Sequence, residues 1–200
     1  MLAFHIGPCR ARIDFSFFAL AAFCCIFTGA EGGLACFSAV CIHEAAHLAV
    51  MCAMGVRPEG VRLSALGCRV ELSGQNVLTD RQDMWVSLAG PGINWLSLAL
   101  TAALGSGSSS FCTASFALAF AHSLPIEPLD GGMALRYFLR GRYGDEKAVI
   151  ISRVISTLFL VPLAVLGFLV LLRTRYNYSL LALSVYLMLY LVMKWDLTQP

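Results

Sequence analysis

Residues 34–54 read LACFSAVCIHEAAHLAVMCAM, an apolar run long enough to cross a bilayer as one helix. Its only charged residue, Glu44, lies between His43 and His47. Because residues i and i+4 share one face of a helix, both imidazoles can reach a single Zn²⁺. Glu44 lies beside them, where it can take a proton from a water molecule bound to the metal. Ionisable groups inside a membrane helix usually mark function. The run therefore predicts a membrane helix with a zinc site; the alternative is a buried polar trio that only holds helices together.

The rest of the chain is also apolar enough for a bilayer. Of its 200 residues, 58% are hydrophobic and only 13% are charged, far from the balance of soluble proteins. Six segments approach the length of a membrane crossing: 15–30, 34–54, 84–105, 111–126 with a broken continuation to about 138, 148–172 and 178–193. Because they follow one another closely, we expect an all-α polytopic membrane protein, a single domain over residues 1–200 with about six transmembrane helices.

Between the second and third segments the hydrophobic pattern changes to a period of two. Apolar residues 61, 63 and 65 alternate with Arg62 and Ser64, and residues 68, 70 and 72 alternate with Arg69 and Glu71. This pattern predicts a small membrane-associated β-hairpin over residues 61–72, with a two-residue turn at 66–67. Leu-Gly is not a favoured hairpin turn, so an irregular interfacial loop is the alternative.

The basic residues predict the orientation of the chain. Most fall on one side of the predicted spans: Arg10, Arg12, Arg57, Arg62, Arg69, Arg81, Arg136, Arg140, Arg142, Lys147 and Lys194; Arg173 and Arg175 fall on the other. The positive-inside rule then places both termini in the cytoplasm and the protein in the cell membrane. A cleaved signal peptide ending near residues 28–30 is the alternative, and it would leave five spans. The net charge is only +2, and the basic residues are scattered instead of forming a run, which argues against a nucleic-acid partner.

A third metal ligand is needed, because catalytic zinc sites usually have three protein ligands and one open position. Asp130 is the best candidate, in a stretch where Pro125, Pro128 and the following glycines break the fourth span near the same membrane face. As an alternative, Asp130 is an ordinary helix cap or turn residue. The eight cysteines include no C-x-x-C pair, so we expect reduced packing residues and no zinc ligands among them.

Three motifs in this order resemble the site-2 protease family of intramembrane metalloproteases: residues 43–47 (HEAAH), 89–94 (AGPGIN) and 125–131 (PIEPLDG). The resemblance covers about residues 34–138. It implies that His43, His47 and Asp130 bind zinc, that Glu44 is the general base, and that Asn94 lies close to the active site, where it would bind substrate or support the transition state. Without the resemblance, Asn94 reads as a helix-packing amide.

Within the family, the six-span layout without an inserted PDZ domain is most similar to the sporulation branch, which processes the membrane-associated pro-sigma-K precursor. We expect no CBS domain, and in this the chain would depart from that branch. It also carries His122 where the family usually has Asn before the first proline of the third motif. An imidazole can donate and accept one hydrogen bond each, so His122 is interpreted as a substrate contact, with a fourth zinc ligand and a packing residue as alternatives.

These patterns together predict a zinc metalloendopeptidase that cuts a membrane-associated protein at or inside the bilayer. Its substrate must be unwound to expose the scissile carbonyl, and pairing as an added strand on the 61–72 hairpin would keep it extended. Inhibitory membrane partners are an expectation, and no oligomeric state is favoured. The alternatives are a membrane zinc transporter and a proteolytically inert membrane regulator.

Overall fold

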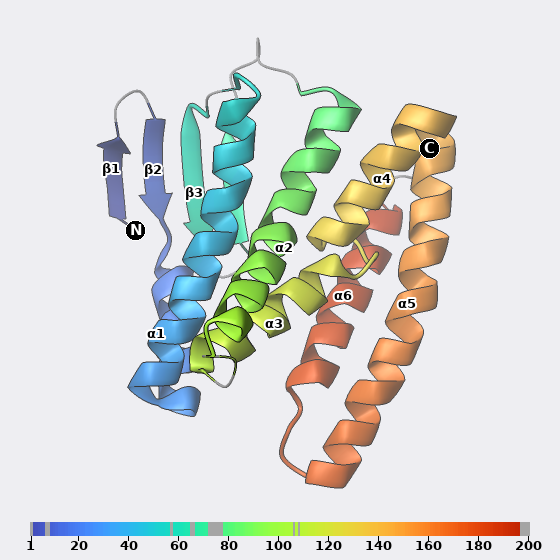
Figure 1. Ribbon diagram of the computed structural model, residues 1–200. Helices are drawn as coiled ribbons and strands as arrows, with labels where there is room; N and C mark the ends of the chain where they lie inside the picture. Colours follow the sequence, from blue (N-terminus) through green and yellow to red (C-terminus); the bar gives the residue numbers. More distant parts are fainter. Residues whose placement is uncertain are drawn as a thin grey trace. The chain divides into compact units, whose positions relative to one another are not determined.

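The computed structural model describes residues 2–6, 9–56, 58–64, 67–71, 78–105, 107 and 109–196, which are mostly helical (Figure 1). Contacts divide the chain into two compact units, Met1–Ala121 and His122–Pro200, and each is described by itself. The first holds β1 (Leu2–Ile6), β2 (Cys9–Ile13), α1 (Phe15–Ala53), β3 (Gly60–Ser64), β4 (Gly67–Glu71), α2 (Asp80–Ala103) and most of α3 (Ser110–Ser123). The second holds α4 (Asp130–Tyr143), α5 (Asp145–Thr174) and α6 (Ser179–Asp196).

Helix α1 is a helical hairpin. Gly29 has φ 75° and ψ 173°, which ends one helical arm and starts the next. The arms run back along each other, since the rings of Phe17 and Phe37 lie 5.8 Å apart and Gly33 leaves no room for a Cβ beside Cys25. Glycine tolerates such a left-handed φ without steric cost. The first two predicted segments are therefore the two arms of α1.

The strands form one sheet in the order β1-β2-β3-β4. Strands β3 and β4 are antiparallel and occupy the predicted hairpin, with Val61 opposite Val70. The predicted turn was wrong by one residue, because Gly67 already belongs to β4 and pairs with Ser64. Strand β2 pairs in parallel with β3, and β1 pairs with β2; neither was predicted. The position of the sheet relative to a membrane surface stays a prediction.

A small apolar cluster ties the sheet to the helices of the first unit. Met51 at the end of α1 packs with Val56 and Leu78, and Val70 of β4 and Val86 of α2 pack against them. On the neighbouring residue pair of the sheet, Arg62 Nε donates a 2.8 Å hydrogen bond to Asp14, which precedes α1 and raises the pKa of the guanidinium above its ordinary value. These contacts join the sheet to both ends of α1 and to α2.

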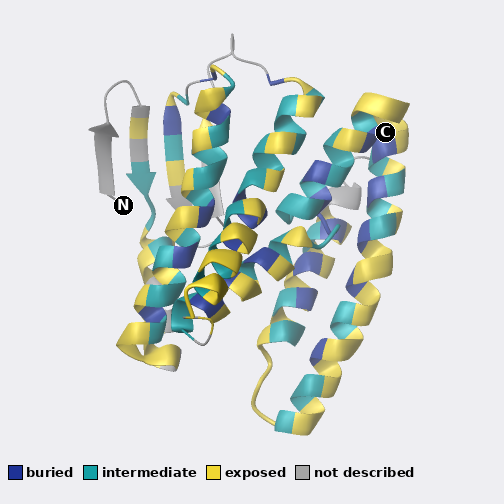
Figure 2. Ribbon diagram, in the orientation of Figure 1, coloured by how far each residue is buried: buried dark blue, intermediate teal, exposed yellow. Residues whose placement is uncertain are grey.

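Three described helical segments are long and apolar enough to cross a membrane: Thr28–Ala53, Asp80–Ala103 and Asp145–Thr174. The apolar part of α6, Ser179–Met193, is shorter. Along α5 large apolar side chains are exposed, with Leu158 at 67% and Val154 at 63% (Figure 2). Such exposure is costly in water and ordinary in a bilayer. The structure supports a membrane protein, and six crossings with cytoplasmic termini stay a prediction.

In the second unit, α5 and α6 pack around the loop that precedes α4. Ile126 of that loop is fully buried with Leu160 of α5 and with Leu187 and Leu191 of α6. Gly132, in the first turn of α4, lies so close to this loop that a Cβ would meet the backbone of residues 126 and 127. The loop is therefore held on one side by α4 and on the other by the pair of α5 and α6.

Candidate metal centre

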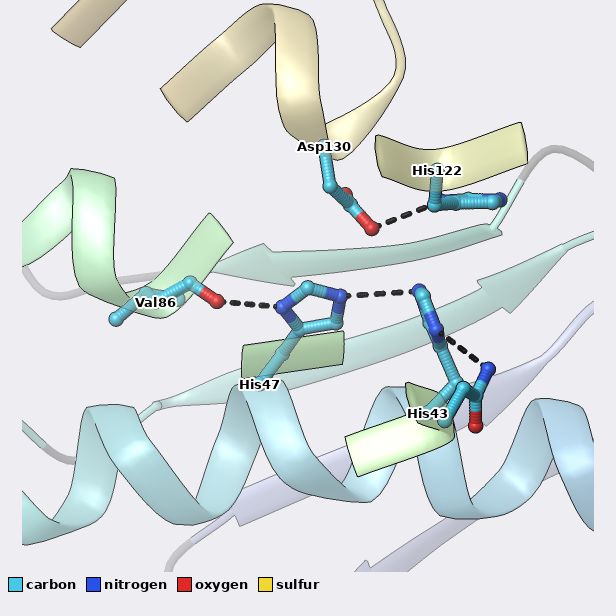
Figure 3. Close-up of polar contacts among 6 residues, drawn as sticks. His43, His47, Val86, His122 and Asp130 are labelled. Carbon is cyan, nitrogen blue, oxygen red and sulfur yellow. Dashed lines mark hydrogen bonds and ion pairs between the residues drawn. The ribbon is translucent and has the colours of Figure 1, made fainter. Parts of the chain in front are cut away.

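The second arm of α1 brings His43 and His47 together as the helical spacing predicts. Their Nε2 atoms face each other at 3.2 Å, and His43 is 2% exposed (Figure 3). The Nδ1 of His47 lies 2.7 Å from the carbonyl oxygen of Val86 in α2. Because a carbonyl only accepts hydrogen bonds, Nδ1 of His47 carries the proton, and its Nε2 presents a lone pair towards His43.

His43 has a side-chain partner in Asn94 of α2. The amide Nδ2 lies 3.1 Å from Nδ1 of His43, and Asn94 is fully buried. In this orientation the Oδ1 of Asn94 has no hydrogen-bond partner among the described residues. Turning the amide over exchanges its oxygen and nitrogen, which are assigned from hydrogen bonding and not seen directly. In the turned orientation Oδ1 accepts from Nδ1–H of His43, and the amide nitrogen takes the buried place that has no partner among the described residues.

The orientation of the amide also determines whether Nε2 of His43 carries a proton or a lone pair. With both Nδ1 atoms protonated, both Nε2 lone pairs point into the same space, 3.2 Å apart. Two facing lone pairs repel unless a cation lies near both, and neutral imidazole with its far nitrogen hydrogen-bonded is the usual metal-binding form of histidine. With the amide oxygen turned towards His43, the two facing Nε2 atoms therefore fit a bound metal ion.

Gly90 lets α2 approach this histidine pair. A Cβ built on Gly90 would lie 2.6 Å from Nε2 of His43 and would also meet Nε2 of His47. Real Cβ atoms essentially never come so close, so only glycine fits at this position. Pro91 follows inside the helix and has no N–H to bond the carbonyl of Ser87, which removes one helix hydrogen bond beside the site.

In the second unit, His122 and Asp130 form a pair of their own. Asp130 is the first residue of α4, and its Oδ2 lies 2.8 Å from Nδ1 of His122 near the end of α3 (Figure 3). The N-cap of α4 is Leu129, so the alternative that Asp130 caps this helix is wrong. A carboxylate in the first turn is nevertheless stabilised by the helix dipole.

The predicted site residues thus fall into two groups. His43, His47 and Asn94 come together in the first unit, and His122 and Asp130 come together in the second. Glu44, next to His43 on α1, is partly buried. By donor type, His43, His47 and Asp130 are a set that can hold a metal ion.

Two features were missed from the sequence. The quoted stretch at residues 89–94 contains Gly90, but the sequence does not show that a side chain there would collide with the imidazoles, because this depends on how the helices pack. Val86 acts through its backbone carbonyl, so its side chain carries no signal. The contacts of Asn94 and His122 are with His43 and Asp130, while their predicted roles towards substrate stay predictions.

The fold resembles that of a solved structure, the site-2 protease from Methanocaldococcus jannaschii, with a TM-score of 0.66 and 20% sequence identity. The match covers 96% of this chain and 94% of that chain. No protein-family model and no curated protein matches the chain. At this identity the likeness is one of fold, and it extends over nearly the whole chain.

Proposed function

We propose that this chain is an intramembrane zinc metalloprotease that cuts a membrane-associated protein. The observation that carries the proposal is the pair of facing Nε2 atoms of His43 and His47, each imidazole held from behind by α2. The two histidines belong to a chain whose fold is similar to that of a site-2 protease. Asp130 is the proposed third ligand, which gives a His₂-carboxylate set and leaves one position open for substrate or water.

Zinc held by these residues would supply a Lewis acid, which would polarise the scissile carbonyl and lower the pKa of water. Glu44 accepts the proton of the attacking water on its carboxylate and later delivers it to the leaving amine. Val86 and Asn94 keep the two imidazoles in the tautomer that binds metal through Nε2. In this mechanism Glu44 stays outside the coordination sphere.

The substrate is proposed to enter as an extended strand beside β4. This strand is the last in the sheet order and pairs with β3 on one side only among the described strands, so an added peptide has backbone partners there. A membrane-tethered sporulation sigma-factor precursor is the first substrate to try, as the family resemblance implies. The proposed topology has both termini in the cytoplasm.

A zinc transporter is the less favoured function. Residues 84–126, which hold the third and fourth predicted spans, contain no Asp, Glu, Lys or Arg, and His122 is their only histidine. Transport paths through a membrane usually carry several ionisable groups in series. A hydrolytic centre needs only the ligand set and one base.

The test uses the purified full chain and measures zinc and peptide cleavage separately. The parent should hold one zinc per chain, and Glu44→Gln should keep that zinc while cleavage falls by roughly 10²- to 10⁴-fold, the usual worth of a general base. A Glu44→Gln protein as active as the parent would rule the mechanism out.

The third ligand is tested with a matched pair of variants. Asp130 and Asp145 are both the first residue of a helix in the second unit. Asp130→Asn should lose zinc, whereas Asp145→Asn should bind it as the parent does. Zinc retained in Asp130→Asn contradicts the ligand set.

A further inference from the structure

A buried polar cluster lies in the loop that carries Asp130. Glu127 is 4% exposed, and its Oε1 accepts a 2.6 Å hydrogen bond from Ser152 Oγ of α5. Its Oε2 lies 3.4 Å from Nη1 of Arg136 in α4. One turn along α5, Ser156 Oγ lies 3.1 Å from the backbone N of Glu127 and 3.3 Å from the carbonyl oxygen of Pro125. Ser152 and Ser156 are both fully buried.

The proposed hydrolysis gives this cluster no chemical step. Glu127 also lies between the two prolines of the third motif, at a position to which the family resemblance assigns no role. Taking a carboxylate out of water is costly unless its oxygens are paired, so a buried Glu needs hydrogen bonds and an opposite charge. Here Ser152 and Arg136 supply both. The carboxylate of Glu127 is therefore paired within the protein, with Ser152 and Arg136, and is shielded from solvent.

The geometry connects the cluster to the metal ligand. Glu127 is three residues before Asp130, and the intervening backbone makes a tight turn in which Leu129 N donates to the carbonyl of Ile126 at 2.8 Å. Ile126 is anchored by its apolar side chain, but an apolar contact has no direction and allows rotation of the loop. The hydrogen bonds of Glu127 and Ser156 have direction, and they fix the loop to α5 at both its side chain and its backbone.

We propose that Glu127 is a positioning residue for Asp130. Its carboxylate joins the Asp130 loop to α5 through Ser152 and to α4 through Arg136, so that the first residue of α4 starts at a fixed place. This inference rests on the proposed function, because it assigns the purpose of the clamp to zinc binding. The clamp is defined as Glu127, Arg136, Ser152 and Ser156.

The test compares Ser152→Ala with Ser184→Ala in the full chain. Both serines are buried in the second unit, but Ser184 Oγ donates to the carbonyl of Leu181 in its own helix, at 2.8 Å, and is not part of the clamp. Two quantities are measured: hydrogen exchange of residues 124–133 in the metal-free protein, and the rate at which zinc passes to a chelator. Ser152→Ala should speed both, the zinc transfer by about tenfold, as for the loss of a supporting hydrogen bond near a metal. Ser184→Ala should leave both unchanged.

Variants of Glu127 separate positioning from general packing. Glu127→Ala should speed exchange and zinc transfer at least as much as Ser152→Ala. Glu127→Gln keeps the acceptor for Ser152 and should lie nearer the parent than Glu127→Ala does. Where Glu127→Ala does not fold, Ser152→Ala decides the question alone.

The outcomes distinguish this inference from the proposed function. If Asp130→Asn loses zinc while Ser152→Ala exchanges and releases zinc as the parent does, the clamp is wrong and the protease proposal stands. Equal effects of Ser152→Ala and Ser184→Ala also overturn the clamp, since they would reflect packing. If Asp130→Asn keeps its zinc, the proposed function itself fails.

Discussion

Asn94 of α2 and His43 of α1 share a fully enclosed contact, with 3.1 Å between the amide Nδ2 and the ring Nδ1. The two residues are far apart in sequence, and the amide atom that faces Nδ1 sets which nitrogen of His43 carries the proton: the amide oxygen requires Nδ1–H, and the amide nitrogen requires Nε2–H. A proton on Nδ1 leaves Nε2 for a metal, whereas a proton on Nε2 blocks it. Asn94 therefore controls whether His43 can act as a ligand.

Replacing Asn94 tests this control. Asn94→Ala removes the partner of Nδ1, and zinc affinity should fall by roughly 10- to 100-fold, as is usual for groups that orient a ligand. Asn94→Asp offers an acceptor only, which enforces the metal-binding tautomer, and it should bind zinc at least as tightly as the parent. Competition with a chelator of known affinity measures both. Parent-like affinity in Asn94→Ala would show that the contact does not orient the ring.

Gly90 and Gly92 provide a matched pair in the same helix. A methyl group at Gly90 would collide with both imidazoles, while a Cβ at Gly92 has nothing within 4 Å. Gly90→Ala should abolish stoichiometric zinc binding, and Gly92→Ala should keep it and stabilise α2 by up to about 1 kcal/mol through helix propensity. Metal analysis and thermal unfolding report the two effects. Equal zinc content in the two variants contradicts the close approach of α2.

The sequence was most informative where local spacing determines geometry. The i, i+4 spacing of His43 and His47 predicted their shared helix face, and the period of two predicted the strands β3 and β4. It failed where pairing is non-local. Residues 9–13 alternate like a strand, but β2 pairs with β3 across the whole of α1, and no local pattern encodes that partner. The arginines of β2 were interpreted only as flanking charges.

The candidate site shows the same division. The types and spacings of the predicted ligands were visible in the sequence, because metal chemistry restricts the residue types. Their supports depend on packing between helices: the carbonyl of Val86 and the space at Gly90 exist only once α2 lies against α1. The role of Glu127 likewise depends on Ser152 and Ser156 of α5, which nothing in the motif indicates.

Strand addition at β4 is tested with two variants of Val70. This side chain packs against the cluster of Met51, Val56 and Leu78, so Val70→Pro alone would mix lost packing with lost backbone pairing. Val70→Ala removes the packing and keeps the N–H, and it serves as the control. Relative to Val70→Ala, Val70→Pro should cut cleavage by about fivefold, the equivalent of one hydrogen bond of about 1 kcal/mol, with zinc unchanged. Equal rates for the two variants would count against β-pairing at this strand.

His122 is expected to orient the carboxylate of Asp130. The sequence left three interpretations open, namely a substrate contact, a fourth zinc ligand and a packing residue, and the structure adds a specific partner, since Nδ1 lies 2.8 Å from Oδ2 of Asp130. A donor at this distance fixes the carboxylate in one orientation, and a metal ligand that is held in place binds more tightly than one that rotates. We therefore expect His122→Ala to lower zinc affinity by about tenfold without removing a ligand.

Two further measurements separate the four roles of His122. His122→Asn keeps a donor that can reach Asp130 and should recover part of the affinity, which a simple packing residue would not require. In the Co²⁺-substituted protein, His122→Ala should keep the visible absorption bands of the parent, because the donor set is unchanged; altered bands would identify His122 as a ligand. Full zinc affinity in His122→Ala with slower cleavage would assign it to the substrate, and full affinity with full cleavage would leave only packing. Either of these last two results would show that the contact with Asp130 does not position the carboxylate.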